Sequence, residues 1–255
     1  MPKAVGYDAD AQAFITATGI TDLTQKNAIN QLVLDLKGYS IWTKMKALYP
    51  FVGGTATTHK FNLKNPLDTD AAFRLVFSGG WTHSATGALP NGTNTNANTF
   101  LTPSTSLTLN SSHLSYYSRT NANTAQIEIG VQTAGQYNLL EIRTSGITYP
   151  LINQSALTSF ADPNSLGFYL GNRQGVTDVD GWKNGVKLVN GTQTSGSLPI
   201  HLLYLGVLNN NNTSFTNYST KECAFSSIGD GLTDTDSANF YTAVQTFQTS
   251  LSRNV

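Results

Sequence analysis

The chain has 255 residues, of which only 12% are charged, and its formal net charge is zero. An average soluble domain has roughly 25% charged residues, so Asn, Thr, Ser and Gly supply much of this surface, which offers hydrogen bonds in place of a charge field. A nucleic-acid-binding protein needs a basic patch to displace counterions from phosphates. The sequence contains no such patch, so we expect no nucleic-acid partner.

The apolar segments are short and cysteine is rare. No run reaches the ~20 apolar residues of a membrane span, and the start, Met1 to Gly6, lacks the apolar region of a signal peptide. We therefore expect no membrane insertion and a product made in the cytoplasm. The single cysteine, Cys223, rules out an intramolecular disulfide.

Residues 1–50 are predicted to be a helical segment. One helix over residues 9–18 ends at Gly19, and a second is capped by Thr21 and closed by Gly38. A third is predicted from Ser40 and is stopped by Pro50. The second helix carries one apolar stripe, Ile29, Leu32, Val33 and Leu36. This stripe either packs on the chain's own sandwich or attaches the chain to another subunit. Packing is favoured, because amphipathic faces are usually buried within their own domain.

From residue 51 to about residue 230, the pattern changes to short strands. Apolar residues recur at alternate positions, as in Phe73, Leu75 and Phe77, between Gly and Asn turn signals. Asn184-Gly185 is a strong hairpin signal, because a type I′ turn needs positive φ at both central residues. Residues 82–98 are predicted to form a long polar loop. The fold predicted for 51–255 is all-β, a two-sheet antiparallel jelly-roll sandwich.

One amphipathic helix is predicted at the end of the chain, over residues 236–252. Asp234 or Asp236 caps it. Its apolar stripe consists of Phe240, Val244, Phe247 and Leu251. We expect this helix to dock on the outside of the sandwich.

Two sets of segments resemble known families. The hairpin Trp182-Lys-Asn-Gly-Val186, the run from Ala224 to Asp230 and the helix start Leu232-Thr-Asp234 resemble the closing half of a concanavalin A-like, laminin G-like jelly roll. The segments Tyr49–Thr55, His59–Pro66 and Asp70–Leu75, with the C-terminal block, resemble a group of bacteriophage-encoded proteins with this jelly roll.

This resemblance implies a non-enzymatic virion structural protein, namely a fibre, tail-associated or capsid-decorating subunit. Its partners would be other virion proteins and copies of itself, with host cell-surface glycans as a further contact. The helical segment or the edge of a sheet would attach it to its neighbours. Its position on the particle, its copy number and the host stay open.

Catalysis is not expected. A glycosidase needs two carboxylates that flank the scissile bond. The chain has only three Glu residues, Glu128, Glu141 and Glu222, and Glu128 is followed by Ile-Gly-Val without an acidic partner nearby. A glycoside hydrolase or lyase with an unusual site is kept as an alternative.

A carbohydrate-binding adhesion module is the first alternative to the virion role. Aromatic rings hold the CH faces of sugars, while amide and guanidinium groups bind their hydroxyls. The candidate glycan-binding residues are Trp81, His83, Asn172, Arg173 and Trp182. Each has a structural interpretation as well, because a Trp beside a strand end is more often buried than exposed.

No cofactor is expected. The Asp178-Val-Asp180-Gly181 cluster is a candidate for Ca²⁺, which is common among concanavalin A-like relatives, but it lacks the further oxygen ligands of a calcium loop. A polar turn before Trp182 is the favoured interpretation. The four His residues are scattered and lack zinc-ligand spacing.

Overall fold

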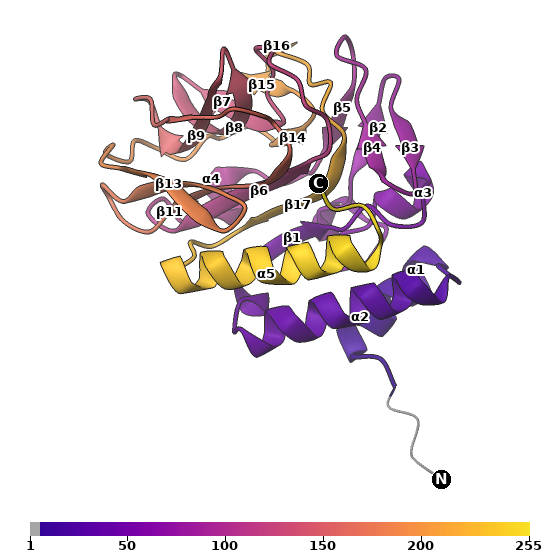
Figure 1. Ribbon diagram of the computed structural model, residues 1–255. Helices are drawn as coiled ribbons and strands as arrows, with labels where there is room; N and C mark the ends of the chain where they lie inside the picture. The colour runs from indigo at the N-terminus through magenta and orange to yellow at the C-terminus, as the bar shows by residue number, and fades with distance from the viewer. Residues whose placement is uncertain (1–5) are drawn as a thin grey trace.

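The computed structural model describes residues 6–255 and shows two β-sheets packed face to face, with the long helices on one side (Figure 1). The predicted all-β, two-sheet antiparallel sandwich with N-terminal helices and one C-terminal helix is confirmed. Within the described residues, every strand pairing is antiparallel except that between β15 and β7.

The first sheet has eight strands. Its order is β13 (Val186–Gly191), β12 (Val179–Lys183), β11 (Gly167–Arg173), β6 (Ser112–Ser118), β17 (Cys223–Gly229), β4 (Gly87–Leu89) and β3 (Thr82–Ser84), with β1 (Met45–Tyr49) paired to β17. The second sheet has nine. It contains β10 (Phe160–Ala161), β9 (Ile147–Gln154), β8 (Gln136–Thr144), β7 (Ile129–Thr133), β14 (Tyr204–Leu205), β5 (Asn96–Asn98) and β2 (Val76–Ser78) in order. In addition, β15 (Leu208–Asn210) pairs with β7, and β16 (Ser214–Thr216) pairs with β15.

Two hydrophobic cores hold these layers together. Alternate side chains of both sheets fill the space between them, for example Leu114 and Tyr116 of β6 and Ile129 and Val131 of β7, all fully buried. The second core lies between the eight-stranded sheet and the helices, where Phe168 of β11 meets the helical layer. The eight-stranded sheet is therefore apolar on both faces over much of its area, whereas no long helix covers the other sheet (Figure 1).

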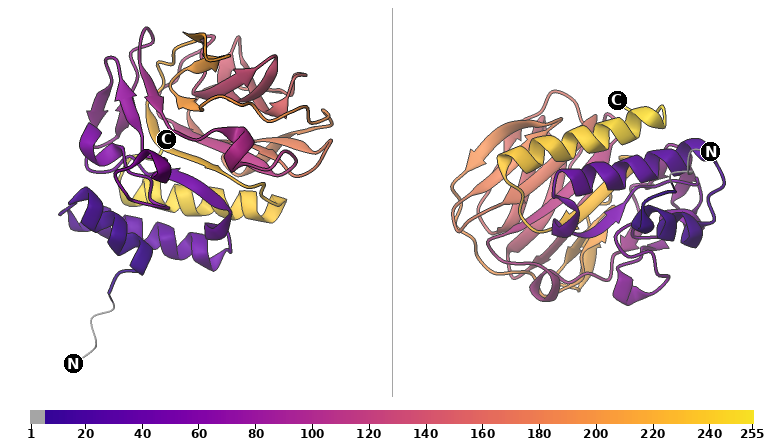
Figure 2. Two further views of the ribbon diagram at one scale, coloured as in Figure 1. Left: turned by 180° about the vertical axis from the view of Figure 1, so that it is seen from behind. Right: turned by 90° about the horizontal axis from the view of Figure 1, so that it is seen from below.

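The helical layer consists of α1 (Ala9–Thr18), α2 (Leu23–Gly38) and α5 (Asp234–Ser250), and Figure 2 shows α2 and α5 side by side below the sheet. Short helices α3 (Ala56–His59) and α4 (Pro103–Ser106) and 3-10 turns at Trp42–Lys44 and Asp70–Ala72 complete the set. The proposed assembly stripe of α2 is at most 1% exposed in each of its four residues, Ile29, Leu32, Val33 and Leu36. It packs in the same core as Phe240, Val244 and Phe247 of α5. This stripe is covered within the molecule and is not a free attachment surface.

The predicted third helix is wrong. After one 3-10 turn, residues 45–49 form β1, which pairs with β17 through Leu48 to Ser227 and Tyr49 to Ser226. Leu48 lies in the helix-side core and Tyr49 in the inter-sheet core. A strand buried on both faces has no alternating polarity, so its sequence resembles a short buried helix. The sandwich thus begins at residue 45, inside the segment predicted to be helical.

The predicted long loop over 82–98 is also more ordered than expected, because it contains β3, β4 and β5. None of the helices in the described part of the chain combines the length and the hydrophobicity needed to cross a bilayer.

Arg253 fastens the end of the chain. The guanidinium is 1% exposed and donates hydrogen bonds to the carbonyl oxygens of Pro50 (2.6 Å), Phe51 (2.7 Å) and Ala224 (3.0 Å). Burial lowers the pKa of Arg253 to about 9, so the group stays cationic at neutral pH. This one side chain connects the end of α5 to β1 and β17.

Candidate functional site

An open cleft of about 480 Å³, the β12–β13 cleft, lies at the β12–β13 edge of the eight-stranded sheet. It is formed by the turn between β11 and β12, by β13 with the residues that follow it, and by the first turn of α5. Its lining residues are Gln174, Thr177, Asp178, Lys187, Asn190, Gly191, Thr192 and Asp234. Apart from the glycine, each lining residue carries a hydrogen-bonding side chain, so the cleft suits a ligand rich in hydroxyl groups.

Lys187 provides the positive charge of the cleft. Its Nζ lies 3.0 Å from Asp180 Oδ2 and 2.6 Å from Asp234 Oδ1, and 5.2 Å from the centre of the Trp182 ring. Partial burial lowers the pKa of Lys187, but the hydrogen bonds to Asp234 and Asp180 outweigh that effect and raise it. The ammonium group is thus a cation held between two carboxylates at neutral pH.

Beneath Lys187, two buried polar atoms lack partners. Asp180 is 1% exposed, and within residues 6–255 its Oδ1 accepts no hydrogen bond and the Trp182 indole Nε1 donates none. Burial raises the pKa of Asp180, and Lys187 partly offsets this. A buried polar atom without a partner costs about 1–3 kcal/mol. A water molecule or a ligand hydroxyl that reached these atoms would therefore bind favourably.

Arg173 holds two walls of the cleft in place. Its guanidinium is fully buried and donates to the carbonyl oxygens of Val176 (2.9 Å), Gln193 (3.1 Å) and Ile152 (2.7 Å). The β11–β12 turn and the segment after β13 are thereby fastened to one cation. The prediction that Arg173 contacts a glycan is not supported by this placement, because its donors face the protein's own backbone.

Asn172 has a similar role on the third wall. Its side chain is 1% exposed, donates to the Leu232 carbonyl oxygen and accepts from the Leu232 amide, both at 2.8 Å. This pair of bonds fixes the entry to α5 and so positions Asp234. Asn172, Asp180 and Asn190 pair in register across β11, β12 and β13. The glycan contact predicted for Asn172 is therefore replaced by a positioning role.

The remaining predicted glycan residues, Trp81 and His83, lie at the opposite edge, on or beside β3. Trp81 is half-buried, donates from Nε1 to the Asn96 carbonyl oxygen at 3.1 Å and packs edge-on against Phe77. His83 Nδ1 lies 2.9 Å from His59 Nδ1. The structure thus divides the five predicted residues into two groups, and only Trp182, Asn172 and Arg173 adjoin the cleft.

The calcium candidates do not form a coordination site. Asp178 is exposed at the cleft mouth, while Asp180 Oδ2 faces the Lys187 ammonium. Among residues 6–255 there is no group of three or more His, Cys, Asp or Glu side chains placed to hold a metal ion.

Glu128, the residue considered for catalysis, is fully buried. Its carboxylate lies 3.1 Å from Lys221 Nζ, also fully buried, and accepts from the Ile142 amide at 2.6 Å. Its carboxylate thus pairs with a buried backbone N–H and a buried ammonium.

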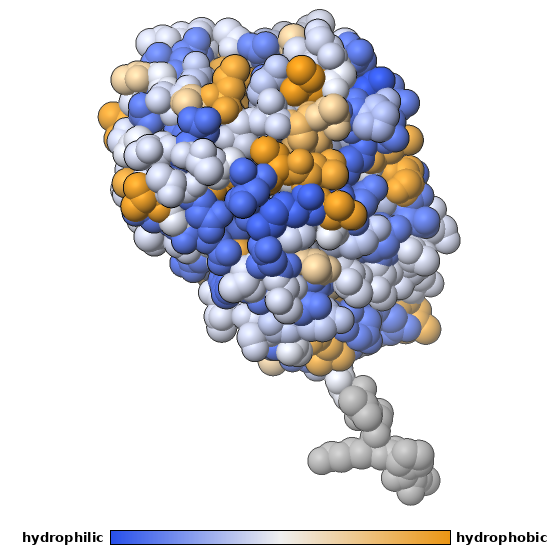
Figure 3. All heavy atoms as spheres, turned by 60° about the vertical axis from the view of Figure 1, so that its left-hand side comes forward, coloured by the Kyte–Doolittle hydropathy of each residue, from blue (hydrophilic) through white to orange (hydrophobic). Residues whose placement is uncertain are grey.

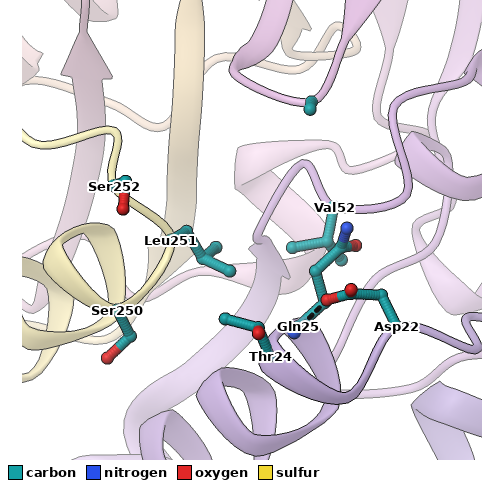
Figure 4. A pocket seen from close by; sticks show the side chains of 8 residues that line it. Asp22, Thr24, Gln25, Val52, Ser250, Leu251 and Ser252 are labelled. Atoms are coloured by element: carbon teal, nitrogen blue, oxygen red, sulfur yellow. Dashed lines mark hydrogen bonds between the residues drawn. The ribbon is translucent and has the colours of Figure 1, made fainter.

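A smaller pocket of about 180 Å³ lies between the start of α2 and the end of α5 (Figure 4). Two of its polar residues have structural duties there: Asp22 caps α2 by accepting from the Gln25 amide at 2.8 Å, and Gln25 Oε1 accepts from the Gly53 amide at 2.8 Å. This pocket is a seam between helices and offers fewer free polar groups than the β12–β13 cleft.

For three of the cleft residues, nothing in the sequence indicated a binding role. Lys187, Asn190 and Asp234 are separated by up to 47 positions from one another and became neighbours only through the pairing of β13 and the return of α5. The Asp178–Asp180 turn and the Asn184-Gly185 hairpin lie at the β12–β13 edge, where the cleft is, but their sequences do not predict the cleft.

Comparison with known proteins assigns no family to the chain. No protein-family model matches the chain, and no curated protein matches it. Among solved structures, the K499G mutant of NanB sialidase from Streptococcus pneumoniae is 14% identical, with a TM-score of 0.41, over 52% of this chain and 24% of that chain. Domain 4 of AbnA, a GH43 extracellular arabinanase from Geobacillus stearothermophilus in complex with arabinotriose, is 14% identical, with a TM-score of 0.41. The match covers 77% of this chain and 98% of that domain.

A Trypanosoma rangeli sialidase is 9% identical, with a TM-score of 0.47, over 85% of this chain and 38% of that chain. The chain spans only about a quarter of the NanB sialidase but almost the whole of the arabinanase domain. At these identities and TM-scores, the similarity assigns neither family nor activity.

Proposed function

We propose that this chain is a carbohydrate-binding module without catalytic activity, and that it binds glycans in the β12–β13 cleft. One observation carries the proposal. The cleft gathers amide, hydroxyl, carboxylate and ammonium groups from three segments above Asp180, a buried carboxylate with one unpartnered oxygen. Sugar hydroxyls both donate and accept hydrogen bonds, so they match this mixture of groups.

The size and charge of the cleft narrow the ligand class. Small-molecule sites commonly measure about 300–1,000 Å³, and this cleft of about 480 Å³ falls within that range. Lys187 is paired with Asp180 and Asp234, and Asp178 also lines the cleft, so three carboxylates and one ammonium leave an excess of negative charge. Neutral or amino sugars are favoured as ligands, and acidic sugars are disfavoured by repulsion.

A glycan array with the intact chain tests this proposal. Affinity for neutral or amino glycans should fall by about tenfold or more in Asn190→Ala. The loss of one polar contact costs about 1.4 kcal/mol, and this free energy corresponds to a tenfold change in Kd. Gln12→Ala, an exposed amide on α1, is the control and should bind like the wild type. Equal binding by Asn190→Ala and the wild type would contradict the site.

A hydrolase is the second candidate, and one feature favours it. A single ammonium bridges two carboxylates, those of Asp180 and Asp234, in one cleft, and glycosidases use two carboxylates. Incubation of the chain with each glycan that it binds, followed by an assay for released reducing ends, separates the candidates. The binding module releases none, whereas release that is lost in Asp180→Asn would favour the hydrolase.

A virion role is the further proposal that the sequence resemblance supplies. It requires no other site, because a particle-borne module of this kind would contact host-surface glycans through the same cleft. Mass spectrometry of purified particles tests it: detection of the chain supports the role, and its absence from particles that contain their other structural proteins would refute it.

A further inference from the structure

Strand β13 is an unpaired edge of the eight-stranded sheet. It ends the strand order on one side and pairs only with β12. Within residues 6–255, the backbone of Val186–Gly191 forms no hydrogen bonds to a second neighbour. It has six residues, whereas the strand at the other end of this sheet, β3, has three. It is therefore a long free edge with unsatisfied donors and acceptors.

This edge has little of the protection that exposed strands usually carry. Such strands are commonly kept short or carry free charges, often Lys, that prevent pairing with other chains. Here Val186 is 57% exposed and Leu188, the extra residue of a bulge against β12, is 43% exposed. The one charged residue, Lys187, is neutralised by Asp180 and Asp234 of the same molecule.

We propose that β13 pairs antiparallel with β13 of a second copy of this chain, about a two-fold axis. An isologous contact places the same strand against itself, so length and hydrogen-bonding pattern match without a separate partner. Val186 and Leu188 of both copies then lie at the interface. Two copies do not repel each other, because the net charge is zero and Lys187 is already paired. The other candidate attachment surface, the α2 stripe, is closed.

Pairing at this edge also has a consequence for binding, which rests on the proposed function. The two-fold axis of an antiparallel strand pair is perpendicular to the sheet, so both copies present the same face. Lys187, Asn190 and Gly191 belong to β13 and line the cleft. The two clefts would therefore flank the interface on one side of a continuous sheet. Such a dimer binds a glycan-coated surface through two sites at once.

Figure 3 shows the side of the molecule that lies at the left in Figure 1, where β13 is found. Hydrophobic groups stand there between hydrophilic areas and do not form one broad apolar surface. The contact is thus expected to depend on backbone pairing with a small apolar contribution, and to be sensitive to a single charge on the strand.

Light scattering over a dilution series of the intact chain tests the pairing. The wild type should be a dimer that dissociates on dilution, and Leu188→Lys and Val186→Lys should each be monomeric at concentrations where the wild type is a dimer. Leu157→Lys is the control, because Leu157 is 64% exposed but lies outside β13. Circular dichroism should show the same fold in all four proteins. A monomeric wild type, or a folded Leu188→Lys that remains a dimer, would overturn the proposal.

A second readout separates this proposal from the binding function. Leu188→Lys should bind a soluble monovalent sugar with the wild-type Kd, yet bind a glycan-coated surface at least about tenfold more weakly, because avidity is lost. If no glycan binds, the binding function fails while the mass measurement still decides the dimer. Equal surface binding by a monomeric Leu188→Lys would refute the two-site arrangement.

Discussion

Both edges of the eight-stranded sheet contain residues that the sequence indicated as candidate glycan contacts, but their side chains make different kinds of contact. At the β12–β13 edge, Arg173 and Asn172 donate hydrogen bonds to four separate backbone segments. At the β3 edge, Trp81 and His83 pack against other rings, those of Phe77 and His59. Buried polar side chains hold loops apart and leave a cleft between them, whereas rings fill the space that they surround. The candidate glycan residues therefore border a cleft at one edge and form a packed ring cluster at the other.

The largest expected change in stability follows from removing the Arg173 guanidinium, the buried cation behind the cleft. Arg173→Ala removes donors to several buried carbonyl oxygens, so we expect the free energy of unfolding to fall by about 3–5 kcal/mol. Urea denaturation measures this loss. Arg74→Ala is the control, because its side chain is 28% exposed and its ion pairs with Asp68 and Asp70 are worth under about 1 kcal/mol. Equal destabilisation by the two changes would contradict the role assigned to Arg173.

The ring cluster should respond with a smaller loss of stability and no loss of binding. Trp81→Ala leaves a partial cavity beside Phe77 and Gly206, and because the ring is only half-buried we expect a cost of about 2–3 kcal/mol. Glycan affinity, measured by calorimetric titration, should equal that of the wild type. Loss of binding in a folded Trp81→Ala would move the site to the β3 edge.

Acid should have opposite effects on the stability contributed by the two buried histidines, His59 and His113, and on that contributed by Asp180. Burial lowers the pKa of His59 from 6.5 to about 3, and burial likewise lowers that of His113 to about 4. The unfolded chain then binds more protons than the folded one below pH 6.5, so stability is lost as the pH falls from 6.5 towards these values. Asp180 has a raised pKa, so the folded chain binds its proton more readily and gains stability from this group as the pH falls.

Urea midpoints at pH 7, 5 and 4 test these signs. His59→Gln should lose less stability on acidification than the wild type, since one of the two buried histidines no longer titrates. Asp180→Asn should lose more, because the favourable protonation is removed. The reverse ranking of the two variants would show that the burial of these groups has been misjudged.

The sequence predicted the layers of this fold better than it predicted contacts across them. Turn signals such as Asn184-Gly185 and the stripe of α5 are local, so the β12–β13 hairpin and the last helix followed from them, whereas β3, β4 and β5 were predicted to be a loop. Strand β1 was missed because a segment buried on both faces lacks periodicity. The role of Arg173 could not be foreseen, because its acceptors lie on segments that meet it only after folding.

The smallest expected effect on stability occurs at the cleft mouth. Gln174 is exposed and lines the cleft, so Gln174→Ala should change the free energy of unfolding by less than about 0.5 kcal/mol. Thermal denaturation followed by circular dichroism checks this. A larger loss would mean that the side chain supports the wall, in which case its substitution no longer reports on binding alone.

The most direct test is a calorimetric titration of one array-selected neutral or amino sugar into the wild type, the double variant Gln174→Ala/Asn190→Ala, and Trp81→Ala. A glycan site in the β12–β13 cleft predicts that the double variant stays folded and loses binding, while Trp81→Ala binds as the wild type does. Binding retained by the double variant and lost in Trp81→Ala would contradict that site.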